Sequence, residues 1–149
     1  RKEYMTLDIE HLTDLEVKEL ISELKRVTGK FPPLMQLYGQ IKDDTIVEGT
    51  LNNIEYKLHR YRHPIDNTRF SISLRFSQTN ETLVRIDINN GTHKNPDKTI
   101  IPQNHIHIYK DTNTNKKDDY AAKLPGHFQH LHDLFEALED FLSYNNIKI

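Results

Sequence analysis

The sequence of 149 residues contains no cysteine and no tryptophan. The lack of cysteine excludes a disulfide framework and every thiolate-ligated zinc or iron–sulfur site, and it fits a reducing cytoplasm. No apolar run approaches the roughly 20 residues that span a bilayer, and the first residues lack the apolar stretch of a secretory signal peptide. We therefore expect a cytoplasmic protein that does not associate with membranes.

The charge balance and the length narrow the choice further. With 20 Lys and Arg against 22 Asp and Glu, the net charge of −2 argues against a protein that coats DNA by charge alone. The length favours a single domain over residues 1–149. We interpret residues 1–4, which precede Met5, as a remnant of cloning or as the end of a longer natural N-terminus. The nine histidines are the unusual feature, because imidazole exchanges protons near neutral pH.

An amphipathic helix is predicted near the N-terminus. Thr13 and Glu16 form a capping box, Leu12 can pack on Val17 as a hydrophobic staple, and Gly29 ends the helix. Its buried stripe has helical spacing and consists of Val17, Leu20, Ile21, Leu24 and Val27.

A second amphipathic helix is predicted near the C-terminus. It starts at Phe128 and stops at Asn145-Asn146, with His130 and His132 on its flank. Its wide apolar stripe consists of Phe128, Leu131, Leu134, Phe135, Leu138, Phe141 and Leu142.

Five segments between these helices are predicted to be strands, namely 45–51, 54–62, 69–76, 82–88 and 100–109. Short turns between several of them favour antiparallel pairing. Residues 31–44 are either a short helix or an irregular packed segment, and the polar stretch 110–119 is predicted to be a mobile loop. The prediction is an α+β fold, a two-layer sandwich in which the N-terminal and C-terminal helices pack on one face of a mostly antiparallel sheet of four to six strands.

Polar residues converge on the predicted strands 82–88 and 100–109. Arg85 and Asp87 share one face of the first strand, and His105, His107 and Tyr109 share one face of the second. If these strands pair, the polar residues form one surface opposite the apolar core. His93, in the connecting loop, can lean over the same place.

One interpretation of this surface is acid–base chemistry without a cofactor. His105 and His107 would share the proton transfers of RNA cleavage, Arg85 would hold the phosphate, and Asp87 and Tyr109 would orient the other groups. A strip on strand 54–62 in which basic and aromatic side chains interleave would bind the RNA; it comprises Lys57, Arg60, Tyr61 and Arg62, with His59 and His63 beside them.

Two alternatives stay open for the same residues. Histidines at positions i and i+2 of a strand lie side by side, so His105 and His107 could chelate a divalent metal with His93 or Asp87 as a third ligand. The other alternative is that the polar side chains only satisfy one another on a solvated sheet face, or form a surface that binds a protein partner. We predict no cofactor, with the metal as the alternative.

The pattern R-x-D, H-x-N-P-D and H-x-H-x-Y resembles that of a family of small uncharacterised bacterial proteins. The resemblance covers residues 83 to about 147 and brings no established reaction. It implies that the following residues belong to one site: Arg85, Asp87, His93, Asn95, Asp97, His105, His107 and Tyr109.

Two functions are predicted from these observations. The first is a ribonuclease-like or RNA-binding protein of a bacterial toxin or defence system, with RNA as its partner. The second is a non-enzymatic inhibitor of the anti-CRISPR or antitoxin type, which binds a nuclease or another protein. In the second, acidic residues of the last helix would mimic a row of phosphates: Asp133, Glu136, Glu139 and Asp140.

Overall fold

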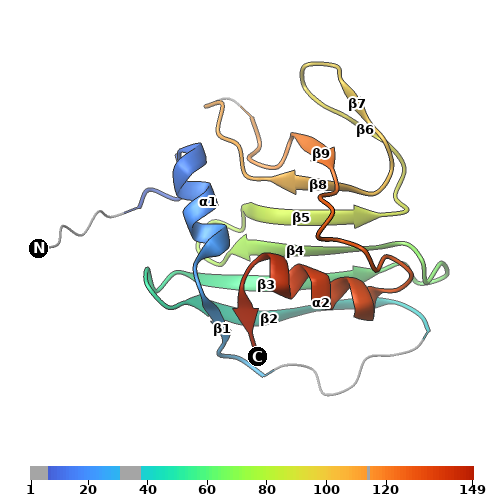
Figure 1. Ribbon diagram of the computed structural model, residues 1–149, viewed down its shortest axis with the longest axis horizontal. Coiled ribbons are helices and arrows are strands. Elements are labelled where there is room, and N and C mark those ends of the chain that lie inside the picture. Colours follow the sequence, from blue (N-terminus) through green and yellow to red (C-terminus); the bar gives the residue numbers. More distant parts are fainter. Residues whose placement is uncertain (1–6, 31–37, 114) are drawn as a thin grey trace, which may run out of the picture.

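The computed structural model describes residues 7–30, 38–113 and 115–149, which form an α+β fold with two helices and a mostly antiparallel sheet (Figure 1). In chain order the elements are α1 (Asp14–Ser22), β1 (Lys25–Val27), β2 (Ile41–Gly49), β3 (Glu55–Arg62), β4 (Phe70–Phe76), β5 (Thr82–Ile88), β6 (His93–Lys94), β7 (Ile100–Ile101), β8 (His105–Ile108), β9 (Ala121–Lys123), α2 (Leu134–Tyr144) and β10 (Ile147–Lys148).

The main sheet has eight strands in the order β10-β1-β2-β3-β4-β5-β8-β9. All neighbours in it are antiparallel except β1 and β10, which are parallel. Strands β6 and β7 form a separate two-stranded hairpin between β5 and β8. The predicted α+β class is confirmed, but four to six strands is wrong, because β1, β9 and β10 have only two or three residues and show no periodicity.

Both helices lie in front of the sheet in Figure 1, where α1 contacts β5 near its start and α2 contacts β4. The strand side chains that alternate inward are fully buried there with residues of both helices. They include Phe70, Ile72, Leu74, Phe76, Val84, Ile86 and Ile88, together with Leu20, Leu134 and Phe141 of the helices. Alternation therefore sends the polar residues of β5 and β8 to the opposite face.

The first helix is shorter than predicted. The capping box of Thr13 and Glu16 is present, but α1 ends at Ser22 and the chain continues as β1. Lys25 is fully buried, and its Nζ donates hydrogen bonds to the carbonyl oxygens of Ile21, Glu23 and Asn145 at 2.9, 2.9 and 2.7 Å. The predicted continuation to Gly29 is wrong because this lysine and the pairing of β1 with β2 hold the chain in an extended form.

The second helix begins later than predicted. Asp133 caps it by accepting a hydrogen bond from the backbone N–H of Glu136. The Asp140 carboxylate accepts hydrogen bonds from the backbone N–H groups of Gln129 and His130, both at 3.1 Å, so this approach to the helix folds back onto it. The predicted start at Phe128 is therefore wrong, and His130 and His132 precede α2.

Several predictions concern residues that the structure does not describe, or properties that it does not test. Residues 1–4 and 31–37 lie outside the described residues. The short helix or irregular segment predicted over 31–44 is wrong at 41–44, because these residues pair with β3 and belong to β2. The mobility of 110–119 and the single domain over 1–149 stay predictions. Among the described residues, neither α1 nor α2 has the length and apolar character of a transmembrane segment.

Candidate functional site

The polar face opposite the core brings Asp87 between two histidines. Strands β5 and β8 pair as predicted, with Arg85 opposite His107 and Asp87 opposite His105. The Oδ2 atom of Asp87 lies 3.3 Å from Nε2 of His107 and 3.5 Å from Nε2 of His105. The predicted convergence of these side chains is thus present in the fold.

The backbone fixes the orientation of both imidazole rings. Nδ1 of His105 lies 3.0 Å from the carbonyl oxygen of Pro102, and Nδ1 of His107 lies 2.7 Å from that of Asp118. A carbonyl oxygen can only accept, so each Nδ1 carries a proton and donates it. The two Nε2 atoms consequently point to Asp87.

Both rings are covered rather than open to solvent. His107 is fully buried and only 3% of His105 is exposed. The ring of His93 on β6 covers them, with its centroid 4.8 Å from that of His107 and 5.7 Å from that of His105. His93 is itself partly exposed, and its Nε2 lies 2.7 Å from the carbonyl oxygen of Asp119. The expectation that both rings face solvent or a ligand directly is therefore wrong, because His93 and the segment 118–119 lie over them.

Polar side chains of the H-x-N-P-D stretch, residues 93–97, hold the segment that carries His93 in place. The Asn95 side chain accepts a hydrogen bond from the backbone N–H of Ala121 at 2.8 Å and donates one to its carbonyl at 3.1 Å. Asp97 accepts from the backbone N–H of Thr99 at 3.0 Å and stabilises the turn between β6 and β7. Asn95 and Asp97 therefore anchor the hairpin. None of these hydrogen bonds goes to the histidine cluster, by which we mean Arg85, Asp87, His93, His105 and His107.

Arg85 forms the exposed border of the cluster. Its Nη1 donates to the Asp118 carboxylate at 2.7 Å, and its Nε lies 3.3 Å from the Asp87 carboxylate. About a quarter of the side chain, 26%, is exposed to solvent. Burial raises the pKa of the Asp87 carboxyl, but the nearby His107 and the Arg85 charge outweigh it and hold this pKa below its ordinary value.

Tyr109 does not join the cluster. Strand β8 ends at Ile108, and the Tyr109 ring turns to the core, where it packs edge-on against Phe76. Its hydroxyl donates to the carbonyl of Ile9 at 2.8 Å and accepts from the backbone N–H of Leu12 at 3.3 Å. Burial raises its pKa to about 12. The prediction that Tyr109 shares the histidine face is wrong, because alternation stops where the strand ends.

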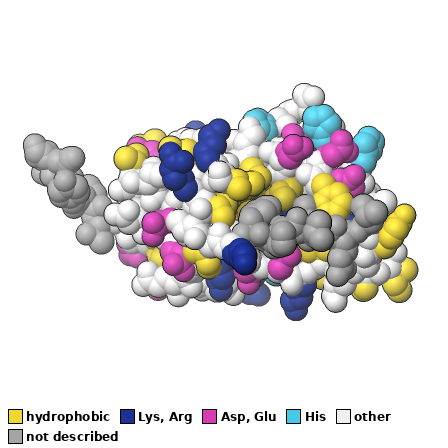
Figure 2. All heavy atoms as spheres, turned by 90° about the horizontal axis from the view of Figure 1, so that it is seen from below, with side chains coloured by type: hydrophobic (Ala, Val, Ile, Leu, Met, Phe, Trp, Pro, Cys, Tyr) yellow, Lys and Arg dark blue, Asp and Glu magenta, His cyan; other side chains and the backbone are white. Residues whose placement is uncertain are grey.

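The residues predicted to bind nucleic acid do not form one surface. Arg60 and Arg62 are buried on the core side of β3, whereas Lys57 and Tyr61 alternate to the other face. Arg60 places Nε and Nη2 each 2.8 Å from the Asp43 carboxylate. In the view from below, Lys and Arg side chains are scattered and form no single basic patch (Figure 2).

Arg62 is held in a similar way on the same side. Its Nε donates to the carbonyl of Gly39 at 2.9 Å, and its guanidinium lies 5.8 Å from the centre of the Phe135 ring. Two of the four predicted binding residues therefore stabilise the fold.

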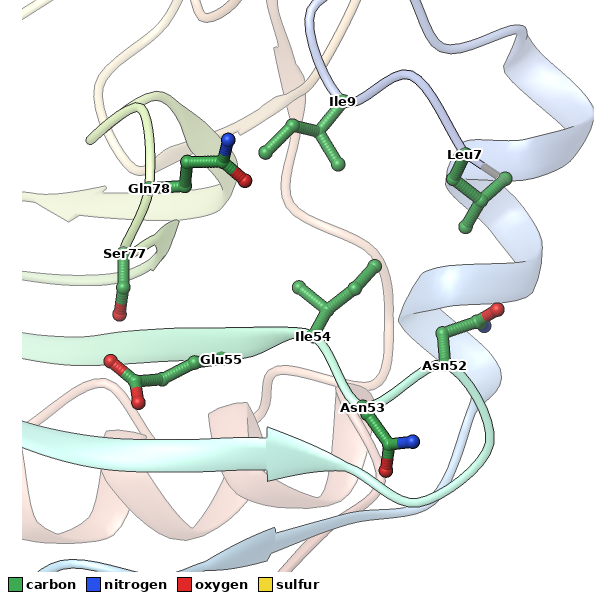
Figure 3. Close-up of a pocket in the computed structure, with 8 residues that line it drawn as sticks. All are labelled: Leu7, Ile9, Asn52, Asn53, Ile54, Glu55, Ser77 and Gln78. Carbon is green, nitrogen blue, oxygen red and sulfur yellow. The ribbon is translucent and has the colours of Figure 1, made fainter.

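A separate pocket of about 650 Å³ lies away from the histidines (Figure 3). It is bounded by the segment before α1, the β2–β3 turn and the β4–β5 turn. Leu7, Ile9 and Ile54 point into it beside polar Gln78 and Asn52. It contains no histidine and one acidic side chain, so it offers no chemistry comparable to that of the cluster.

Sequence reasoning missed Asp118. This residue fixes His107 through its carbonyl and Arg85 through its carboxylate. The Asp118-Asp119 pair at the end of a polar loop was the available signal, since a loop between two neighbouring strands returns to the same sheet edge.

No curated protein matched the chain, and no solved structure matched it. Residues 12–147 match the family of unknown function DUF6978, so the predicted resemblance to a family without an established function is confirmed. By this match, which includes both helices and every residue of the histidine cluster, the chain belongs to that family of unknown function.

Proposed function

We propose that this protein is a ribonuclease-like protein of a bacterial defence or toxin system, acting on RNA in the cytoplasm at the histidine cluster. One observation carries the proposal: a guanidinium and an imidazole, those of Arg85 and His93, form the exposed border of a cluster in which His105 and His107 are buried. A phosphate needs a fixed cation and a nearby proton donor, and this border offers both.

The buried and exposed residues take different roles in this proposal. Arg85 holds a non-bridging oxygen of the phosphate while the ribose 2′-oxygen bonds to phosphorus and loses its proton to water. The bond from phosphorus to the leaving 5′-oxygen breaks, and His93 gives a proton to that oxygen. His105 and His107 have too little exposed surface to touch RNA. Their role is to hold Arg85 in position through Asp87, and to hold His93 in position by packing against its ring. This assignment replaces the expectation that His105 and His107 share the proton transfers.

The inhibitor alternative has less support from the acidic helix. Asp133 serves as the N-cap of α2, and Asp140 holds the chain before that helix. Only Glu136 and Glu139 remain exposed of the four acidic residues that could mimic phosphates. A row of two carboxylates is a poor imitation of a nucleic-acid backbone.

A direct test is incubation of the tag-free protein with a mixed RNA pool, followed by separation on a denaturing gel. We expect cleavage by the wild type and at least a tenfold loss in Arg85→Gln and in His93→Gln, on the order expected for one catalytic group. Exposed Arg26→Gln and His132→Gln are the matched controls and should keep full activity. Equal cleavage by all five proteins, or none by the wild type with or without divalent metals, would reject the proposal.

A further inference from the structure

We propose that Asp87, His105 and His107 bind one divalent transition-metal ion, with zinc as the best fit. This inference goes beyond the proposed function, because metal binding needs no RNA and is measured without it. Among the described residues, these three offer ligand atoms that all lie within 4.8 Å of one another.

The distances from the Asp87 carboxylate oxygen to the two imidazole nitrogens match a tetrahedral ion. Zinc binds histidine nitrogen and carboxylate oxygen at about 2.0 to 2.1 Å, so neighbouring ligands of a tetrahedron are about 3.3 to 3.4 Å apart. The Asp87 Oδ2 atom lies 3.3 Å from His107 Nε2 and 3.5 Å from His105 Nε2. The Asp87 oxygen is therefore at the spacing that a tetrahedral ion requires from each nitrogen, and the two nitrogens lie within 4.8 Å of each other.

The protonation pattern also favours a cation at this point. Because both Nδ1 atoms donate to backbone carbonyls, a neutral ring presents the lone pair of Nε2 to the Asp87 carboxylate. A metal ion at this point accepts both Nε2 lone pairs and the carboxylate oxygen at the same time. His107 Nε2 is buried and has no hydrogen-bond partner, although the Asp87 Oδ2 atom lies 3.3 Å from it.

The surrounding residues supply the outer contacts that metal-binding side chains need. A ligating histidine normally donates its second ring nitrogen to a carbonyl or carboxylate, which fixes the ring and raises its basicity. The carbonyls of Pro102 and Asp118 do this for His105 and His107, and Arg85 lies against the Asp87 carboxylate. These contacts distinguish the cluster from a chance meeting of polar groups on a sheet.

The number of ligands indicates the kind of site. Three protein ligands leave a fourth position for water or a substrate, as in catalytic zinc sites, whereas structural zinc sites use four. Two imidazoles and a carboxylate also suit iron(II), nickel and copper, so competition between metals belongs in the test.

The test uses the tag-free full chain, freed of metal with a chelator and then titrated with zinc in a calorimeter. We expect one zinc ion per chain and a rise in the thermal unfolding midpoint. Asp87→Asn and His105→Gln should weaken binding at least tenfold, while the surface variant H127Q/H130Q/H132Q keeps the wild-type affinity. Titration with nickel and copper in the same way establishes the preference.

A spectroscopic readout covers the case in which a buried variant folds poorly. Cobalt bound to the wild type should show the intense visible absorption of a tetrahedral site. Asp87→Asn is a near-isosteric change at a partly exposed residue. This variant should lose the visible absorption and keep the circular dichroism spectrum of the wild type. The proposal is overturned if the wild type takes up no metal, or if the surface variant loses binding and Asp87→Asn keeps it. Zinc binding without RNA cleavage rejects only the proposed function, and cleavage without metal binding rejects only the site.

Discussion

The backbone carbonyl of Asp118 accepts a hydrogen bond from Nδ1 of His107 over 2.7 Å, so a residue of a polar loop decides which nitrogen of a buried ring faces Asp87. The same residue holds Arg85 through its carboxylate, also at 2.7 Å. The main chain and the side chain of Asp118 therefore have separate effects, which a substitution can distinguish.

Asp118→Asn removes the charge and keeps the carbonyl. We expect the free energy of unfolding, measured in urea, to fall by less than about 1 kcal/mol, because the ion pair with Arg85 is partly exposed. Zinc affinity should fall by less than about tenfold, which is the low end of the loss seen when a residue that orients a metal ligand is changed. Complete loss of zinc binding in a folded Asp118→Asn protein would show that the side chain, and not the carbonyl, holds the site together.

Lys25 is expected to stabilise the junction of the two helices. Its ammonium group lies at the C-terminal ends of both α1 and α2, where it satisfies three carbonyl oxygens. Lys25→Met leaves these buried acceptors without a donor, and we expect a loss of about 2 to 4 kcal/mol in the free energy of unfolding. A change below about 0.5 kcal/mol in a denaturant titration would mean that water replaces the lysine without cost.

The pH dependence of stability should carry the signature of the same lysine. Burial lowers the pKa of Lys25 to about 8 from its ordinary 10.5, with the Glu23 charge opposing the shift. Between these values the unfolded chain binds more protons than the folded one, so Lys25 makes the protein more stable as pH rises from about 8 to 10.5, by up to about 3 kcal/mol.

The difference in stability between wild type and Lys25→Met isolates this effect, because the ionisation of buried tyrosines such as Tyr109 is common to both proteins. Urea titrations at pH 7.5 to 10.5, a window set by the two pKa values, should show the difference growing in favour of the wild type. A constant difference over that range would contradict the lowered pKa.

Arg60 should matter for stability and not for RNA binding. It is fully buried and pairs with the Asp43 carboxylate through two 2.8 Å contacts. Asp43→Ala leaves a buried cation without this partner, and we expect a loss of about 3 kcal/mol. The RNA affinity of the folded variant, measured by fluorescence anisotropy, should equal that of the wild type. A selective loss of RNA affinity would restore Arg60 to the binding surface.

The sheet and the centre of the site could be predicted because strand alternation assigns each residue to a face. The period of two placed Arg85 and Asp87 on one side of β5 and His105 and His107 on one side of β8, and their pairing followed from chain order. The same rule failed at Tyr109, where β8 ends one residue earlier and the side chain turns to the core.

The remaining errors concern contacts between distant parts of the chain. The stripe through Leu24 and Val27 has helical spacing, but Lys25 bonds to Asn145, 120 residues away, and β1 pairs with both β2 and β10. Local periodicity contains no information about such partners. The same holds for Asp118: the acidic pair at the end of its loop indicates that the loop returns to the sheet edge, but not that the backbone carbonyl fixes His107.

The most direct test of the account is a crystal structure of the zinc-soaked protein with diffraction data collected on both sides of the zinc absorption edge. We predict one strong anomalous peak about 2.0 to 2.2 Å from the Nε2 atoms of His105 and His107 and from the Asp87 carboxylate. A map with no peak there, or with zinc only on the exposed histidines before α2, would contradict the central claim that these three side chains form one metal-binding site.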